Sequence, residues 1–145
     1  MDLESHYKSL ANMYHAAPIN EFFPPSVTIS KGCSEVGLAV RQDYFHAANS
    51  LHGSVYFKLL DDSAFFAANS IEPNVFVFTV KFTTTITKPV LSGFVKAQGK
   101  IDKIEGKKIW ASSVMTDDLG EVVAKGEGLF LPSPHKLSDV ESYKP

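Results

Sequence analysis

The chain has 145 residues, of which 44% are hydrophobic and 21% are charged, and its formal net charge is −2 at pH 7. This size suits a single domain with a buried core, and so small a negative charge argues against nucleic acid as a partner. No apolar run approaches the roughly 18 residues of a membrane span, and the single Cys33 excludes an internal disulfide. Because residues 1–14 lack the apolar stretch of a signal peptide, we expect a cytoplasmic protein with no membrane contact.

The first predicted element is a short amphipathic helix over residues 2–15. Its apolar residues Leu3, Tyr7 and Leu10 are three and four positions apart, which is the spacing of one helix face. The sequence Phe-Phe-Pro-Pro at residues 22–25 ends this segment, because proline cannot continue a helix. The N-terminal helix and its lead-in are therefore expected to precede the main domain.

Two short strands and one long helix follow. Residues 27–29 and 35–40 are predicted strands, separated by a Lys-Gly turn, and residues 43–51 form a predicted loop. The longest helix is predicted over residues 52–70, where Glu-Pro-Asn at residues 72–74 stops it. This helix is apolar on most sides, which indicates that it lies at the centre of the core.

The rest of the chain is predicted to form four strands in hairpin succession, at residues 75–86, 94–104, 108–116 and 121–131. The first of these strands alternates, which predicts one aromatic face toward the core, made by Phe76, Phe78, Val80 and Phe82. Such a sheet needs an apolar partner, and only the central helix is large enough. The predicted fold class is therefore α+β, with an antiparallel sheet wrapped around one long central helix.

The predicted elements divide the chain into three parts. Residues 1–25 form the N-terminal helix and lead-in, residues 26–132 form the main domain, and residues 133–145 form an irregular C-terminal tail. We expect the tail to be irregular because the last residues of a chain are often poorly ordered.

The central helix carries the residues that suggest chemistry. Two adjacent carboxylates, Asp61 and Asp62, lie among Phe, Leu and Ala, and a carboxylate in apolar surroundings is costly unless it is paired or used. The helix opens at His52-Gly53-Ser54, so its first unpaired N–H groups are covered only by the smallest side chain. One end of the helix can accept developing negative charge, and its middle offers a base.

These residues suggest a family. The sequence His52-Gly53-Ser54, followed by Leu59, Asp61 and Ala68-Asn69, resembles the catalytic helix of the PaaI-like, or 4-hydroxybenzoyl-CoA thioesterase-like, branch of the hotdog superfamily. The later strands resemble the same family at Asp118-x-Gly120 and Val123-Ala124-x-Gly126. The resemblance covers roughly residues 30–131, and its helix motif is more specific than its strands.

The resemblance implies a hotdog fold, a homodimer or a dimer of dimers, and hydrolysis of acyl-CoA thioesters without a metal or an organic cofactor. It implies that the backbone N–H of Gly53 polarises the thioester carbonyl and that Asp61 activates water or attacks directly. Thr79, on the following strand, would orient the water. His46 stands where the family has an asparagine that supports the carbonyl.

Two positions depart from the family pattern, and one assignment stays open. Ser54 replaces the second glycine, although it can cap the helix start and, with His52, contact the substrate. His46 replaces the loop amide. The stretch that begins at Asp62 mimics the family's Asp-Thr-Ala-Phe better than the stretch that begins at Asp61, whereas the gapless spacing from His52 favours Asp61.

The length of the helix adds an inference that needs no family. Gly53 and Asp61 are eight residues apart, which corresponds to about 12 Å along a helix axis. One thioester carbon cannot contact both, so a shared substrate requires Gly53 of one subunit and Asp61 of another, with the two helices antiparallel across a twofold axis.

Two other functions remain as alternatives to the thioesterase. A non-catalytic acyl-thioester-binding or regulatory protein on the same scaffold would explain why Ser54 and His46 depart from the family pattern. A hotdog hydratase or dehydratase would need a catalytic histidine paired with an acid in a different motif, which the sequence does not contain.

Overall fold

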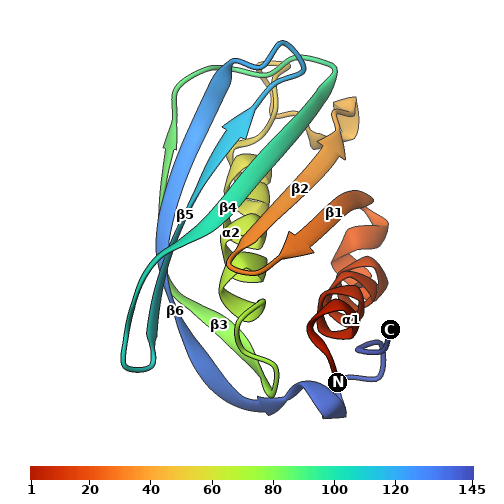
Figure 1. The fold of residues 1–145 in the computed structure, drawn as a ribbon. Helices are drawn as coiled ribbons and strands as arrows, with labels where there is room; N and C mark the ends of the chain where they lie inside the picture. Colours follow the sequence, from red (N-terminus) through yellow and green to blue (C-terminus); the bar gives the residue numbers. More distant parts are fainter.

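The computed structural model describes all 145 residues. Six strands form one antiparallel sheet in the order β1-β2-β4-β5-β6-β3, and two long helices accompany it (Figure 1). The elements in chain order are α1 (Leu3–Ala16), η1 (Pro18–Glu21), β1 (Pro25–Ser30), β2 (Cys33–Ala39), η2 (Gln42–Tyr44), α2 (Gly53–Asn69), β3 (Val75–Ile86), β4 (Phe94–Glu105), β5 (Lys108–Thr116), β6 (Val122–Lys136) and η3 (Leu137–Asp139). None of the helices is both long enough and apolar enough to cross a membrane.

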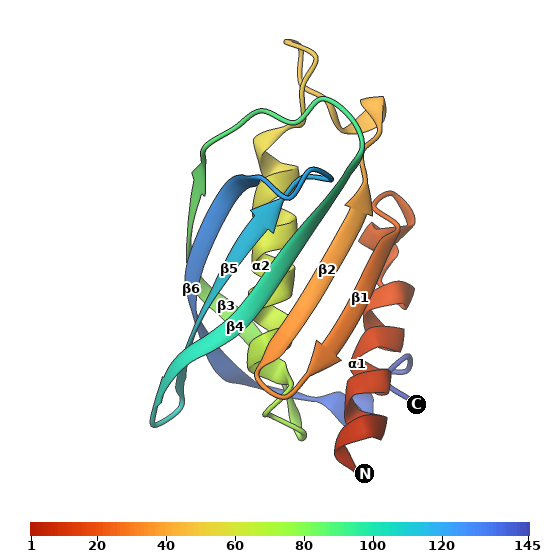
Figure 2. The ribbon, with the colours of Figure 1, turned by 45° about the horizontal axis from the view of Figure 1, so that its top comes forward.

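The sheet curls around α2, and α1 packs beside β1 on the side of α2 that the sheet leaves open (Figures 1 and 2). Leu59, Leu60 and Ala64 of α2 are fully buried against the sheet. On the other side, the ring of Tyr14 in α1 packs edge-on against Phe66, with 4.8 Å between their centroids. The predicted α+β class, with an antiparallel sheet around one central helix, is confirmed.

Close contact between β4 and α2 fixes the position of the helix along the sheet. A Cβ atom on Gly99 would lie 2.2 Å from the carbonyl oxygen of Ser63, so only glycine permits this approach. Two hydroxyls on the neighbouring strands donate to carbonyls of α2. Ser34 bonds Ser63 O at 2.6 Å and Ser113 bonds Leu60 O at 2.9 Å. These bonds satisfy carbonyls of α2 that are buried under the sheet.

The predicted aromatic face of β3 is confirmed for Phe76 and Phe82, which pack against the core, and is wrong for Phe78 and Val80. Val77 is completely buried on the inner face, whereas Phe78 and Val80 are 43% and 46% exposed. A β-bulge at Val80 inserts one unpaired residue, so the alternation changes phase and Phe82 returns to the core. Thr79 lies two residues after the buried Val77 and, like it, points toward α2.

The expectation of an irregular tail is also wrong for its first part. Strand β6 continues to Lys136, which pairs with Val75 at the start of β3. The next residue, Leu137, is buried in the main core. Near the C-terminus the hydroxyl of Tyr143 lies 2.5 Å from Nδ1 of the buried His6. Residues 131–136 of β6 thus pair with the start of β3.

Candidate active site

Asp61 lies on the face of α2 that the sheet does not cover. Its Oδ1 accepts a hydrogen bond of 2.8 Å from the hydroxyl of Thr79 on β3, and no Lys, Arg or His lies within ion-pair distance of its carboxylate. Burial raises the pKa of Asp61 to about 6. The hydrogen bond from Thr79 and the charge of Lys58 oppose this rise, and the charge of Asp62 adds to it. Asp61 is therefore a carboxylate poised to exchange a proton near neutral pH.

Asp62, the alternative acid, has different surroundings. Its Oδ2 forms an ion pair with Lys58, four residues earlier on α2, with 2.6 Å between the atoms. The same oxygen accepts a hydrogen bond of 2.6 Å from the hydroxyl of Tyr14 in α1. Two donors thus hold Asp62 in place, whereas Asp61 accepts only one hydrogen bond, from a neutral group. Of the two carboxylates, Asp61 is the better placed to accept a proton.

Both carboxylates border one large pocket of about 600 Å³. It lies between the open face of α2, the start of β3 and the N-terminal segment. Its lining is mainly apolar and holds six phenylalanines, Phe23, Phe57, Phe65, Phe66, Phe76 and Phe78. A concave, mostly apolar cavity with a few polar groups at one place is the usual form of a small-molecule site.

The N-terminus of α2 forms a separate part of the candidate site. Gly53 is the first residue of the helix, so its N–H has no partner within the helix. It borders a hollow of about 350 Å³ together with His46, Ile86 and Lys88. Thr79 and Asp61 lie in one pocket, and Gly53 and His46 lie in another. A single subunit therefore does not bring the two predicted groups of catalytic residues together.

His52 and Ser54 organise the start of the helix. Nδ1 of His52 accepts hydrogen bonds from the backbone N–H of Ser54 at 3.0 Å and from its hydroxyl at 2.7 Å. The N-cap of α2 is therefore His52, and the expectation that Ser54 caps the helix is wrong. Both donors of Ser54 bond His52, and the N–H of Gly53 beside it has no hydrogen-bond partner.

The side chain of His46 is hydrogen-bonded within its own loop. Its Nδ1 accepts from the N–H of Ala48 at 3.0 Å, and its Nε2 bonds the hydroxyl of Ser50 at 2.9 Å. The tight turn is completed by Asn49 in the left-handed conformation, with φ of 62°. Both ring nitrogens are thus used, and the imidazole has no free donor for a substrate carbonyl in this arrangement.

Sequence reasoning missed two polar residues beside Asp61. Lys58 precedes Asp62 by four positions, a spacing that brings charged groups together on a helix and was a usable signal. Tyr14 could not be found in this way because it is 48 positions from Asp62 and belongs to another helix. The N-terminal helix was predicted as an element, but its part in lining the pocket was not.

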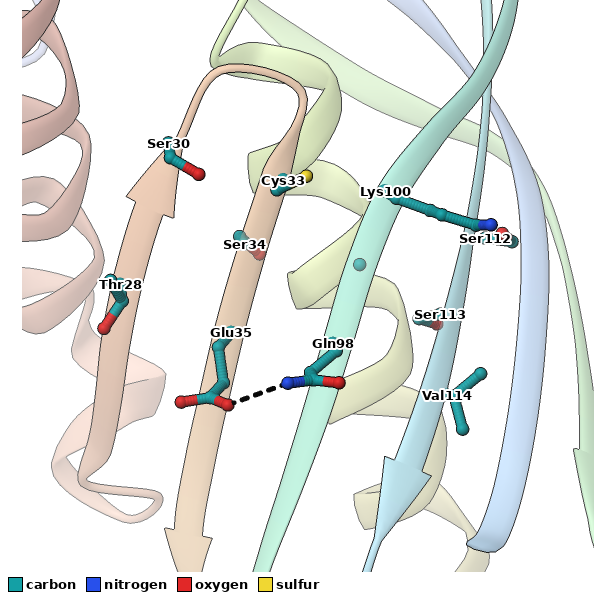
Figure 3. A pocket seen from close by; sticks show the side chains of 11 residues that line it. Thr28, Ser30, Cys33, Ser34, Glu35, Gln98, Lys100, Ser112, Ser113 and Val114 are labelled. Atoms are coloured by element: carbon teal, nitrogen blue, oxygen red, sulfur yellow. Dashed lines mark hydrogen bonds between the residues drawn. The ribbon is translucent and has the colours of Figure 1, made fainter.

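Another hollow, of about 520 Å³, lies across the outer face of β1, β2, β4 and β5 (Figure 3). Its polar groups are largely used within the fold, since Gln98 bonds Glu35 and the two buried serines bond α2. Asp61 and Gly53 lie outside it, so we do not assign the active site here. No cluster of metal-ligating side chains exists in the chain.

Solved structures share this fold at low sequence identity. The Escherichia coli PaaI protein of the phenylacetic acid degradation operon superposes with a TM-score of 0.80 at 17% identity, over 90% of this chain and 97% of that one. A structure from the thioesterase superfamily gives 0.78 at 20% identity, over 88% and 98% of the two chains. A mutant of PaaI from Thermus thermophilus gives 0.72 at 19%, over 80% and 99%.

Neither a protein-family model nor a curated protein sequence matches the chain. These three structures are nevertheless covered over 97–99% of their length, with TM-scores of 0.72–0.80. The chain therefore has the hotdog fold, in the form found in PaaI and in thioesterase-superfamily structures.

Proposed function

We propose that this protein is an acyl-CoA thioesterase in which Asp61 activates the attack on the thioester. The observation that carries the proposal is the state of Asp61: a carboxylate free of any cation, bonded by Thr79, bordering an apolar pocket, with a pKa raised to about 6. Such a group is ionised at neutral pH and is still basic enough to take a proton from water. The structural likeness to PaaI and to the thioesterase superfamily supports the same reaction.

The proposed chemistry needs both parts of the site. Asp61 takes a proton from a water molecule, whose oxygen bonds to the thioester carbon while the carbonyl oxygen becomes negative. The free N–H of Gly53, at the positive end of α2, stabilises that oxygen. The carbon–sulfur bond then breaks, and the CoA thiolate leaves and takes up a proton. Direct attack by Asp61 through an anhydride requires the same ionised carboxylate.

A second copy of the chain would complete the site. Strand β3 is an edge strand, paired only with β6, and a long exposed edge with apolar side chains favours pairing with another chain. Phe57, Phe78 and Val80 are each more than 40% exposed beside this edge. Pairing of two β3 edges across a twofold axis would place two α2 helices antiparallel, with Gly53 of one protomer near Asp61 of the other.

The proposal is tested by thiol release from a panel of acyl-CoAs with wild type, Asp61→Asn and Asp62→Asn. We expect turnover by wild type and a loss of about 10²- to 10⁴-fold in Asp61→Asn, the range for a general base. Asp62→Asn should stay within about tenfold of wild type, since Asp62 is held by structural partners. Absence of turnover on every acyl-CoA would overturn the enzyme assignment, and selective loss in Asp62→Asn would overturn the choice of acid.

One observation favours the second candidate, a non-catalytic acyl-thioester-binding protein. Both ring nitrogens of His46 are hydrogen-bonded within its own loop, so the thioester carbonyl would have the N–H of Gly53 as its only donor in this region. A binding protein would retain acyl-CoA without releasing thiol. Equilibrium binding measured beside the turnover assay distinguishes the two functions.

A further inference from the structure

The N-terminal segment contributes a whole wall to the pocket that holds Asp61. Six of its residues line the cavity, and they come from α1, from η1 and from the turn that follows: Met13, Tyr14, Ala17, Ile19, Asn20 and Phe23. The opposite wall consists of α2 and the start of β3, which carry Asp61 and Thr79. Whatever occupies the cavity next to Asp61 must therefore lie against residues 13–23.

This wall is held in place by a defined set of bonds. The hydroxyl of Tyr14 donates to Asp62 at 2.6 Å, and the ammonium group of Lys58 lies 5.1 Å from the centre of the Tyr14 ring and 5.7 Å from that of Phe23. Asn20 donates from Nδ2 to the carbonyl of Tyr14 at 2.7 Å, which joins η1 to the end of α1. The wall thus has a fixed position relative to Asp61.

The charges of the cavity are largely neutralised within it. Lys58 is the only cation among the lining residues, and it is paired with Asp62. Asp61 is the one remaining charged side chain of the lining, and it has no counter-ion. A ligand group with a negative charge would meet Asp61 and find no free cation, whereas an uncharged apolar group would lie among phenylalanine rings and aliphatic side chains.

From this geometry we infer that residues 13–23 determine the acyl specificity of the proposed thioesterase. The inference rests on the proposed function and deepens it. The acyl group lies between this wall and α2, its size is limited by Ile19 and Phe23, and its chemical class is uncharged and apolar. Acyl groups that end in a carboxylate are excluded by the paired state of Lys58.

The test is a specificity profile, measured as kcat/KM for acetyl-, hexanoyl-, decanoyl-, tetradecanoyl- and glutaryl-CoA. Ile19→Ala enlarges the pocket and Ile19→Trp narrows it. Ile19 is exposed, so the fold tolerates both changes. Phe23→Ala enlarges the pocket further. The matched control is Phe22→Ala, because Phe22 is the adjacent phenylalanine but lies outside the cavity.

We expect wild type to prefer an uncharged chain over glutaryl-CoA by at least about 100-fold, in line with the cost of an unpaired buried charge. Ile19→Ala and Phe23→Ala should raise the ratio of tetradecanoyl- to hexanoyl-CoA turnover by about tenfold, and Ile19→Trp should lower it, since pocket size commonly discriminates by this factor. Phe22→Ala should leave the ratio unchanged.

The two levels of the proposal fail in different ways. Loss of the proposed function would appear as absence of thiol release by wild type on all five substrates. If wild type turns over but its profile is the same in Ile19→Ala, Ile19→Trp and Phe23→Ala, residues 13–23 do not set specificity. Efficient hydrolysis of glutaryl-CoA would contradict the assignment of an uncharged acyl group.

Discussion

The hydroxyl of Thr79 donates to Oδ1 of Asp61 over 2.8 Å, and this bond joins the middle of α2 to the edge strand β3. Thr79 points toward α2 because it lies two residues after the buried Val77, with no register shift between them. The bond leaves the second oxygen of Asp61 without a protein partner. One oxygen is thus fixed in direction, and the other is free to take a proton from water.

Removal of this bond should change the pH dependence of turnover in a known direction. Because the hydrogen bond from Thr79 lowers the pKa of Asp61, Thr79→Val should move the acid limb of the kcat/KM profile to higher pH. Thr79→Ser keeps the hydroxyl and should keep the limb close to its wild-type position of about pH 6. The same limb in Thr79→Val and wild type would show that the bond does not act on the ionisation that governs turnover.

Asp61 is expected to destabilise the folded protein at neutral pH. Its pKa is raised from 3.8 to about 6 in the fold, so the folded state binds the proton more tightly than the unfolded state does. The stability that this proton contributes is present below about pH 4 and is lost as pH rises through about 6. Asp61→Asn should therefore be more stable than wild type at about pH 8, by about 2 kcal/mol.

The measurement is urea unfolding of both proteins across this pH range, at one fixed protein concentration because assembly affects apparent stability. The difference between Asp61→Asn and wild type should shrink as pH falls from about 7 to about 4. A difference that does not depend on pH would show that the side-chain replacement, and not the ionisation of Asp61, is responsible.

Asp62 should affect stability more than turnover. Asp62→Asn leaves the ammonium group of Lys58 without its ion-pair partner and weakens the bond from Tyr14, which should cost about 1–3 kcal/mol in urea unfolding. Because the charge of Asp62 raises the pKa of Asp61, the acid limb of kcat/KM should move to lower pH, opposite to Thr79→Val. A limb that moves to higher pH in Asp62→Asn would contradict this electrostatic relationship.

The sequence predicted the elements of this fold well because their signals are local. The central helix was predicted over residues 52–70 and is observed as Gly53–Asn69, since His-Gly-Ser and Glu-Pro-Asn mark its two ends. The first long strand was predicted over residues 75–86 and is observed with the same bounds. Hydrophobic periodicity and turn residues are properties of neighbouring positions, so they can be read without knowledge of the fold.

The site could be predicted only in part because its details arise from contacts between distant residues. The alternation of Phe78, Val80 and Phe82 continues across the bulge, so the sequence contains no sign that Phe78 and Val80 point outward while Phe82 packs against the core. The adjacent carboxylates Asp61 and Asp62 are chemically identical in the sequence. The spacing of Lys58 from Asp62 is a local difference between them, and a further difference arises when α1 and α2 pack together and the hydroxyl of Tyr14 reaches Asp62.

If Gly53 of one subunit and Asp61 of the other form one site, two substitutions at Gly53 distinguish the role of its N–H from the role of its missing side chain. Gly53 is the first residue of α2 and has an ordinary negative φ, and His52 before it is extended, with ψ of 141°. Proline suits this position and removes the N–H donor. Gly53→Pro should therefore fold and lose about 10²- to 10³-fold in kcat. Gly53→Ala keeps the N–H, and its Cβ would lie 3.6 Å from Ile86, so it should remain active.

Mixed dimers then test whether Gly53 and Asp61 act across two subunits. When Gly53→Pro and Asp61→Asn chains are co-expressed, each mixed dimer has one site with an intact Gly53 from one chain and an intact Asp61 from the other. Random pairing should restore about a quarter of wild-type activity, because half of the dimers are mixed and half of their sites are intact. If both residues acted within one subunit, every site would carry one defect. Mixing would then restore nothing, and the model of a shared site would have to be abandoned.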